Sequence, residues 1–317
     1  MIPSRCKTSG LAVVAATALA VPAAAHAASP PAARGGAATQ YYVSLGDSYA
    51  VGYQPRADGS PGAGTRDGFA YVLPRLAAKK GWRLRLVQFG CPGATSASIL
   101  EQKGCPAPGP GGRAYLGTTQ VAAAERFIRR NRRRVGLITV SIGGNDVTAC
   151  VSAPNPTLCV ANAAAPLRAN VRTLLRRIRR AAGPRVRIVG TTYPDVILGA
   201  WLAGEEGRTL ATLSVGAFQT VINPTLRQEY EAVRARFVDV TAATGAYIPL
   251  DQTTTVEPFG PIPVAVARVC ELTWFCAFQD IHARASGYRV IAQLIARTLP
   301  KQKPAKPKPK RKARARR

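Results

Sequence analysis

The sequence predicts an α/β protein, a three-layer α/β/α sandwich around a central, mostly parallel sheet of five strands. Apolar runs alternate with helical segments between about residues 40 and 299, which is the element order of a single α/β domain. The apolar runs are apolar on both faces, as parallel strands covered by helices on each side are. Strands are expected at 41–45, 84–89, 137–142, 187–191 and 237–240, and helices at 69–80, 119–131, 163–182, 213–234 and 287–298.

Residues 1–28 have the pattern of a secretory signal peptide. Arg5 and Lys7 precede the apolar stretch "GLAVVAATALAVPAAAHAA", which ends at the small-residue site Ala25-His26-Ala27. This stretch is shorter than the about 20 unbroken apolar residues of a membrane span. We therefore expect cleavage near residue 28, a short linker at 29–39, a domain at 40–299, and a secreted, extracellular protein.

The cysteines are consistent with export. Cys6 belongs to the predicted signal peptide, and the other six fall into three close pairs. An even number in an exported chain indicates disulfides, although six cysteines allow 15 connectivities. A metal site is the alternative, but the chain has no C-x-x-C motif and only two histidines, so we expect no metal and no other cofactor. We predict sequential pairing: Cys91 with Cys105, Cys150 with Cys159, and Cys270 with Cys276.

The positive charge is concentrated at the C-terminus. The formal net charge is +28, and residues 301–317 hold ten basic residues and no acidic one. We expect residues 300–317 to be a disordered Lys/Arg/Pro tail. Such a tail indicates adhesion to an anionic cell-envelope surface, with a purely solubilising role as the alternative. We expect a monomer with no dedicated nucleic-acid partner.

Small and polar residues follow three of the predicted strands. The motif Gly46-Asp47-Ser48 follows the first strand, "FGCPGATS" spans the end of the second, and Gly143-Gly144-Asn145-Asp146 follows the third. Each of them could be an ordinary turn. In open parallel sheets, however, ligands bind beyond the carboxyl ends of the strands. The sequence therefore predicts a site at this edge, with Ser48 as a candidate nucleophile.

The histidines limit the choice of a base for Ser48. The chain has only His26 and His282, and His26 lies in the predicted signal peptide. If an imidazole activates the serine, it must be that of His282. A lone histidine is often structural, but His282 lies in "FQDIHARASGY", just before the last predicted helix, where it can reach the sheet edge. We therefore expect His282 to be the base.

These motifs together resemble the four blocks of the SGNH hydrolases, also called the GDSL lipase/esterase family. The resemblance rests on "GDS" at 46–48, Gly93 in "CPGAT", "GGND" at 143–146, and an aspartate shortly before His282, and it spans about residues 40–299. The paired cysteines additionally resemble those of secreted actinobacterial members. The resemblance implies a flavodoxin-like fold. The G-x-S-x-G elbow of other α/β-hydrolases is absent, because Ala50 stands where its second glycine would be.

The resemblance implies a role for each of these residues. Ser48 is the nucleophile, and the backbone N–H groups of Ser48 and Gly93 form an oxyanion hole with the side-chain amide of Asn145. The family usually has an aspartate three residues before the histidine, where this chain has Gln279. We expect Asp280, two residues before His282, to orient the imidazole, with a backbone carbonyl as the alternative. Asp47 and Asp146 are expected to be structural.

The implied function is that of a secreted serine esterase or lipase acting on a lipid or another acyl ester. The alternatives are a non-catalytic binder of envelope polyanions and an acyltransferase that uses the same nucleophile. The segment 242–276 is rich in proline, aromatic and aliphatic residues. We expect it to line an apolar acyl pocket near His282, with a surface loop packed on itself as the alternative.

Overall fold

The structure is a computed structural model that describes residues 38–302. The predicted signal peptide, almost all of the predicted linker and the basic tail beyond residue 302 lie outside the described residues. Within 38–302, no helix combines the length and the apolar character that crossing a bilayer requires.

A five-stranded parallel sheet forms the centre of the described domain. Its strands lie in the order β4-β1-β5-β6-β7, and every neighbouring pair is parallel. Counted along the chain, this is the flavodoxin-like order 2-1-3-4-5, whose ligands bind where the order reverses, between β1 and β5. The five predicted strands are confirmed to within two residues at each end. Their bounds are β1 Gln40–Gly46, β4 Leu84–Gln88, β5 Val135–Ser141, β6 Arg187–Thr191 and β7 Arg236–Val238.

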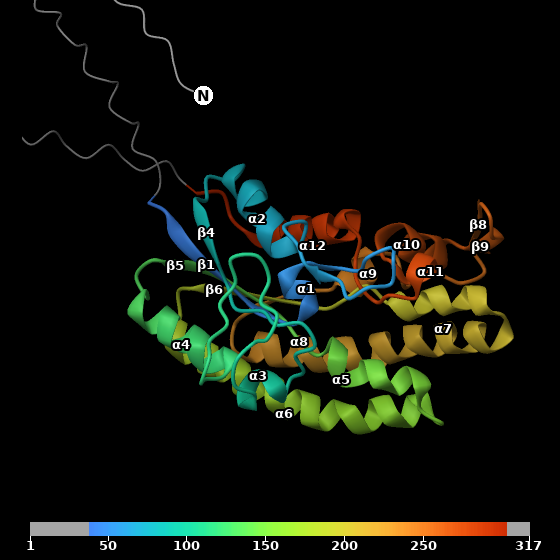
Figure 1. Cartoon of the computed structure of the whole chain (residues 1–317), viewed down its shortest axis with the longest axis horizontal. Helices are drawn as coiled ribbons and strands as arrows, with labels where there is room; N and C mark the ends of the chain where they lie inside the picture. The colour runs from blue at the N-terminus through green and yellow to red at the C-terminus, as the bar shows by residue number, and fades with distance from the viewer. Residues whose placement is uncertain (1–37, 303–317) are drawn as a thin grey trace, which may run out of the picture. The chain divides into compact units, whose positions relative to one another are not determined.

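Helices cover both faces of this sheet, which confirms the three-layer prediction. Successive side chains of β1 alternate between two cores: Tyr42 packs with α2 and α12, whereas Val43 and Leu45 pack with α4, α6 and α8. In Figure 1, α2 and α12 lie on one side of the strands and α4, α6 and α8 on the other. These helices are α2 Phe69–Ala78, α12 Ala285–Thr298, α4 Gln120–Arg130, α6 Pro156–Ala182 and α8 Asn223–Ala232.

Two helices begin earlier than the sequence pattern predicts. Helix α6 begins at Pro156 instead of residue 163, because the Asn155 side chain accepts a hydrogen bond from the Leu158 N–H and proline fits the first helical turn. The helix expected at 213–234 is a longer run in three parts. It consists of α7 (Glu205–Ala217), the π-helical turn η3 (Phe218–Ile222) and α8.

Shorter elements connect the sheet edge to the helices. They are α1 Ser48–Val51, β2 Tyr53–Gln54, β3 Ala63–Gly64, α3 Ser98–Glu101, α5 Gly144–Thr148, and the 3₁₀ segments η1 Ala149–Ser152 and η2 Val196–Ala203. Helices α1 and α5 begin directly after β1 and β5, so both start at the edge where the strand order reverses.

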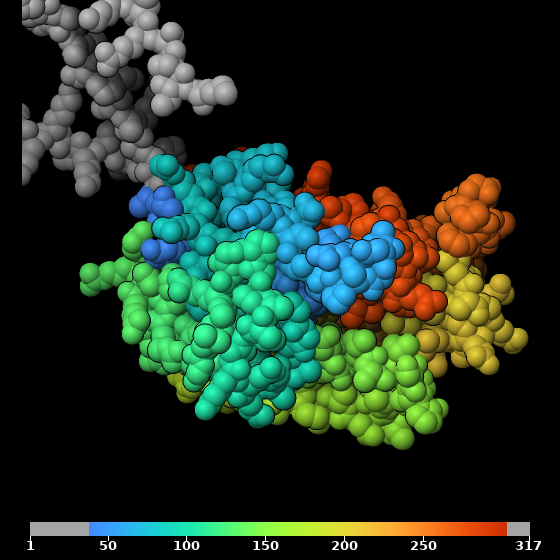
Figure 2. Space-filling model, viewed as in Figure 1, coloured from blue at the N-terminus to red at the C-terminus, as the bar shows by residue number. Residues whose placement is uncertain are grey.

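The segment 242–276 has its own secondary structure and core. It contains the end of α9 (Val240–Ala243), a hairpin of β8 (Thr253–Val256) and β9 (Gly260–Pro263), α10 (Val264–Leu272) and the start of α11 (Phe275–Phe278). Its side chains Ile262, Val266 and Val269 are buried against η2 and α7. In Figure 2 the hairpin of β8 and β9, coloured orange, projects from the surface of the domain.

Three disulfides join the cysteines in the sequential pairs that the sequence predicts. Cys91 is bonded to Cys105, Cys150 to Cys159, and Cys270 to Cys276. The first bridge holds the loop after β4, the second joins η1 to the first turn of α6, and the third joins α10 to α11. The first bridge lies at the end of β1, where the Cys91 N–H donates to the Gly46 carbonyl at 2.9 Å.

Candidate active site

Ser48 lies at the point where β1 leaves the sheet. It is the first residue of α1, with Asp47 as the N-cap, and its side chain is almost fully buried. Gly46, the last residue of β1, has φ +140°, and a Cβ there would lie 2.0 Å from the Ser141 carbonyl oxygen of β5. Only glycine allows this approach. Because glycine has no side chain, the turn that carries Ser48 can lie against the end of β5.

A buried glutamine fixes the position of Gly46. The Gly46 N–H donates to Oε1 of Gln120 at 2.7 Å, and Nε2 of Gln120 donates back to the Gly46 carbonyl at 3.0 Å. Gln120 is 2% exposed, at the start of α4. The sequence analysis missed this residue. The available signal was a polar side chain on a helix face that is otherwise apolar.

Asp47, the residue before Ser48, is held by two hydrogen bonds. Its carboxylate accepts hydrogen bonds from the Tyr49 N–H at 2.9 Å and from the Tyr193 hydroxyl at 2.5 Å. Burial raises the pKa of Asp47 to about 7, and the nearby charge of Asp146 acts in the same direction, whereas the hydrogen bonds from Tyr193 and Tyr49 oppose the rise. These contacts agree with the structural role expected for Asp47. Tyr193 was not identified from the sequence.

The loops that carry Gly93 and Asn145 are bonded to each other. Nδ2 of Asn145 donates to the Ala94 carbonyl at 2.9 Å, which uses one of its two N–H bonds and leaves the other for a ligand. Asp146 accepts hydrogen bonds from the N–H and the hydroxyl of Ser96. Gly93 itself has φ +76°, a conformation that favours glycine. The loops after β4 and β5 therefore form one unit beside Ser48.

The His282 ring is hydrogen-bonded to an aspartate. Nδ1 of His282 lies 2.8 Å from Oδ1 of Asp280, and the His282 backbone N–H donates to the same oxygen at 2.9 Å. Gln279, the residue in the place where the family usually has the acid, has φ +53° and ends α11. Partial burial raises the pKa of Asp280, but the hydrogen bond and charge interaction with His282 outweigh it and hold that pKa below its usual value.

Aromatic contacts bring the imidazole to the serine side of the domain. The His282 ring packs against the ring of Tyr53 in a tilted arrangement, with 4.2 Å between ring centroids and 36° between ring planes, and its centroid lies 5.9 Å from that of Tyr49, the neighbour of Ser48. The Tyr49 hydroxyl also donates to the Ile281 carbonyl at 2.6 Å. Within residues 38–302, the ring hydrogen-bonds only to Asp280, not to Ser48. Such catalytic contacts often tighten only when substrate binds.

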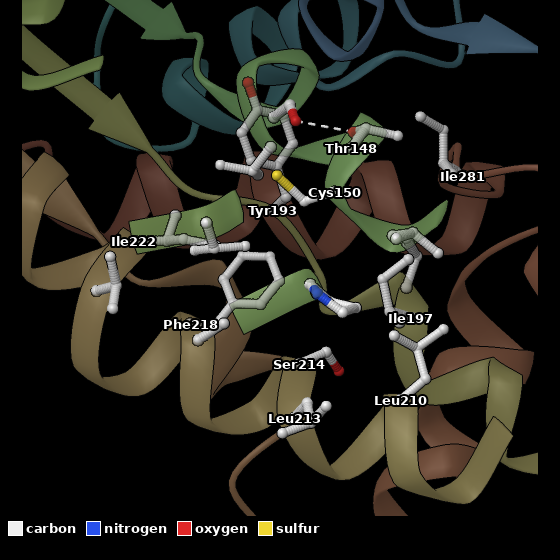
Figure 3. A pocket seen from close by; sticks show the side chains of 18 of the residues that line it. Thr148, Cys150, Tyr193, Ile197, Leu210, Leu213, Ser214, Phe218, Ile222 and Ile281 are labelled. Atoms are coloured by element: carbon white, nitrogen blue, oxygen red, sulfur yellow. Dashed lines mark hydrogen bonds between the residues drawn. The ribbon is translucent and has the colours of Figure 1, made fainter. Parts of the chain in front are cut away.

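An apolar cavity opens beside Ser48 and Asn145. Its volume is about 340 Å³, within the range of small-molecule sites, ~300–1,000 Å³. One wall comes from α5, η1 and the first turns of α6, and the other from η2, α7 and η3. Figure 3 shows side chains of both walls. They include Thr148 and Cys150 from the first wall and Ile197, Leu210, Leu213, Phe218 and Ile222 from the second.

The expectation that segment 242–276 lines an acyl pocket near His282 is wrong. None of the described residues that line the cavity belongs to this segment. Its apolar side chains are buried in the separate core that packs α10 against η2 and α7. The same segment still contacts the histidine loop, because the Trp274 N–H donates to the His282 carbonyl at 2.9 Å.

The fold and this site together define a flavodoxin-like α/β protein with the residue arrangement of a serine hydrolase. The model of the GDSL-like lipase/acylhydrolase family matches residues 44–290, so the chain belongs to that family of ester hydrolases. The resemblance found in the sequence motifs is thereby confirmed.

Two solved structures of lipolytic enzymes are similar to this chain. Phospholipase A1 from Streptomyces albidoflavus NA297 is 19% identical, with a TM-score of 0.51 over 82% of this chain and 98% of that one. An extracellular lipase from Streptomyces rimosus is 18% identical, with a TM-score of 0.47 over 80% and 99%. The first of these similarities supports the shared fold. No curated protein matches the chain significantly.

Proposed function

We propose that this protein is a secreted carboxylic ester hydrolase that works through an acyl-enzyme on Ser48. The observation that carries the proposal is the Asp280–His282 hydrogen bond, made by the one histidine that follows the predicted signal peptide, in a loop packed on the helix that begins with Ser48. An oriented imidazole beside a serine in an apolar cavity is the arrangement that nucleophilic acyl transfer requires.

In the first half-reaction, the Ser48 hydroxyl attacks the ester carbonyl carbon while Nε2 of His282 takes its proton. Asp280 keeps the other imidazole proton on Nδ1, so that Nε2 is free to act as the base. Negative charge develops on the carbonyl oxygen, and the backbone N–H groups of Ser48 and Gly93 and the free N–H of Asn145 stabilise it. Each such donor typically contributes a factor of ~10²–10³ in turnover.

Collapse of this intermediate expels the alcohol, which receives its proton from His282. A water molecule then attacks the acyl-enzyme with His282 as the base, and the acid leaves as Ser48 regains its proton. A bound metal has no step in this sequence, and the cofactor-free mechanism expected from the sequence stays part of the proposal.

The proposal is tested by hydrolysis of p-nitrophenyl acetate together with labelling by a fluorophosphonate. We expect the wild type to be active and labelled at Ser48, and Ser48→Ala to lose labelling and to lose turnover by roughly 10⁴–10⁶-fold. Ser286→Ala is the matched control, because Ser286 is exposed on α12 and lines no cavity. Turnover of Ser48→Ala at the wild-type rate would contradict the mechanism.

We also propose that the protein acts outside the cell. The signal-like N-terminus and the three disulfides support this, because disulfides persist in oxidising compartments. The basic C-terminus would add adhesion to anionic envelope polymers. Deleting residues 303–317 should weaken binding to anionic vesicles at low salt, and the difference should vanish at high salt, where exposed charges are screened. Equal binding at low salt would leave only a solubilising role.

A further inference from the structure

The cavity beside Ser48 is placed to receive the acyl side of an ester. Ser48 and Asn145, which would hold the reacting carbonyl group, both line it. His282, which would protonate the leaving alcohol, is not among the described residues that line it, although its neighbour Ile281 is. An ester bound with its carbonyl between Ser48 and Asn145 therefore directs its acyl chain into the cavity and its alcohol toward His282. This step rests on the proposed function.

Four of the hydroxyl groups along the cavity donate hydrogen bonds to other groups of the protein. Three threonines donate to carbonyls four residues earlier: Thr148 to Gly144 at 2.8 Å, Thr212 to Arg208 at 2.9 Å, and Thr220 to Gly216 at 2.7 Å. Ser214 likewise donates to the Ala211 carbonyl at 2.8 Å, or to the buried Asp195 at 2.9 Å. These four hydroxyl groups are therefore already partnered within the protein, and most of the other lining side chains are apolar. The lining therefore suits an apolar chain and offers little to a sugar or a peptide.

Packing requires glycine at one position of α7 but not at a second position. A Cβ on Gly207 would lie 2.0 Å from the Ala200 carbonyl oxygen, so the close packing of α7 on η2 requires glycine there. A Cβ on Gly216 would meet nothing within 4 Å, and Gly216 is not among the glycines with positive φ. Glycine is less favourable than alanine inside a helix. Neither packing nor backbone conformation explains Gly216.

The place of Gly216 on the cavity wall explains it. Gly216 lines the cavity, three residues after Leu213 and four before Thr220, so the three residues share one helix face. The opposite wall contains Cys150 and Val160, and the Cys150–Cys159 bridge joins the two segments that form this wall. With one wall held by a disulfide, a side chain at position 216 would narrow the space between the walls.

We propose that Gly216 is a specificity-determining residue: it keeps the cavity open for a linear apolar acyl chain, and the preferred substrates are esters of medium-chain or longer acids. The wild-type kcat/KM should then rise by about three- to fourfold for each added methylene until the cavity is full, because each buried methylene adds a similar increment of binding. A side chain at position 216 should stop this rise at a shorter chain.

The test compares Gly216→Ala, Gly216→Leu and Gly216→Phe on p-nitrophenyl acetate, butyrate, octanoate and laurate. We expect the ratio of kcat/KM for octanoate to that for acetate to fall stepwise, by about 50-fold in Gly216→Phe, which corresponds to about three methylenes. Gln219→Phe is the matched control, because Gln219 is exposed on the adjacent η3 and lines no cavity. An octanoate-to-acetate ratio in Gly216→Phe equal to that of the wild type overturns the proposal.

Two further measurements distinguish a failure of this proposal from misfolding of a variant and from a failure of the proposed function. Thermal melting should show Gly216→Ala at least as stable as the wild type, because no atom lies within 4 Å of the new Cβ; if the phenylalanine variant unfolds, alanine and leucine still give a graded series. Binding of decanoate, measured by calorimetry, is a readout that needs no turnover. Loss of this binding in Gly216→Phe supports the proposal even if no ester is hydrolysed, an outcome that would overturn only the proposed function. Equal binding of decanoate by the wild type and Gly216→Phe would contradict the assignment of the cavity as the acyl site.

Discussion

The serine loop after β1 and the histidine loop before α12 meet at the same edge of the sheet, but they are held there differently. Gly46 is bonded by Gln120, 74 residues away, and Asp47 by Tyr193, 146 residues away, and all four residues are buried. His282 is oriented by Asp280, only two residues away, and the side chains of this pair are 12% and 22% exposed.

This difference separates two kinds of dependence. The position of Ser48 depends on tertiary packing across the whole domain, because the partners of its loop come from other elements. The orientation of the His282 ring depends on a local hydrogen bond supported by aromatic contacts at a partly exposed edge. Substitutions at the serine loop should therefore affect both stability and activity, whereas those at the histidine loop should affect activity almost alone.

The largest effect is expected for Asp280→Asn. An amide can present its N–H to Nδ1 and favour the wrong tautomer of His282, and in a well-studied triad the equivalent change costs about 10⁴ in turnover. The melting temperature should change little, because the pair is local and partly exposed. Turnover on p-nitrophenyl acetate and thermal melting, with His282→Ala as the scale, measure both quantities. A loss below about tenfold would mean that Asp280 does not orient the base.

Gly46→Ala should have the next largest effect, and on stability as well. The new Cβ would lie 2.0 Å from the Ser141 carbonyl oxygen at φ +140°, so strain and overpacking together should lower the unfolding free energy by about 4 kcal/mol. Urea unfolding measures this change. Gly93→Ala is the control, because a Cβ there would meet nothing within 4 Å and only its φ of +76° adds strain. Equal losses in both variants would show that strain alone is responsible.

Asp47 and Asp280 have pKa values shifted in opposite directions, so the two loops should depend differently on pH; buried Asp195, whose pKa is also raised to about 7, adds to the pH dependence of the wild type. The pKa of Asp47 is raised to about 7, so between about pH 4 and 7 the folded protein keeps a proton that the unfolded chain releases. The unfolding free energy should therefore fall as pH rises through this range. The pKa of Asp280 is lowered, so its contribution is lost only as pH falls below about 4.

Asp47→Asn isolates this contribution. The amide cannot ionise, so the unfolding free energy of the variant relative to wild type should rise by about 3 kcal/mol between pH 5 and pH 8. Asp280→Asn should show no such change over the same range. Unfolding in urea at both pH values checks the prediction, and parallel pH profiles of wild type and Asp47→Asn would contradict it.

The sequence predicts elements and motifs whose signal is local. The five strands could be located to within two residues because most of their residues are apolar on both faces. Ser48, Gly93, Asn145 and His282 could be singled out because each follows a strand or precedes a helix. The partners of Gln120 and Tyr193 could not be found: the polar side chain of Gln120 on an apolar helix face indicates a buried contact, but a hydrogen bond across 74 or 146 residues leaves no pattern that names the residue it bonds. The cavity was assigned to the wrong segment because composition does not tell which core an apolar side chain joins.

A comparison of two glutamines tests the difference between the loops most directly. Gln120 bonds both backbone groups of Gly46 and is buried, whereas Gln54 bonds the Trp274 indole at 2.7 Å and the Ala283 carbonyl at 2.8 Å beside the histidine loop and is only partly buried. Gln120→Leu leaves a buried N–H and a buried carbonyl without partners, so we expect a loss of about 2 kcal/mol in unfolding free energy, together with reduced turnover as Ser48 moves. Gln54→Leu should cost less than about 1 kcal/mol, because water can replace the lost bonds. Urea unfolding and p-nitrophenyl acetate turnover of the two variants give both quantities; equal losses would mean that the histidine loop is held by tertiary packing as firmly as the serine loop.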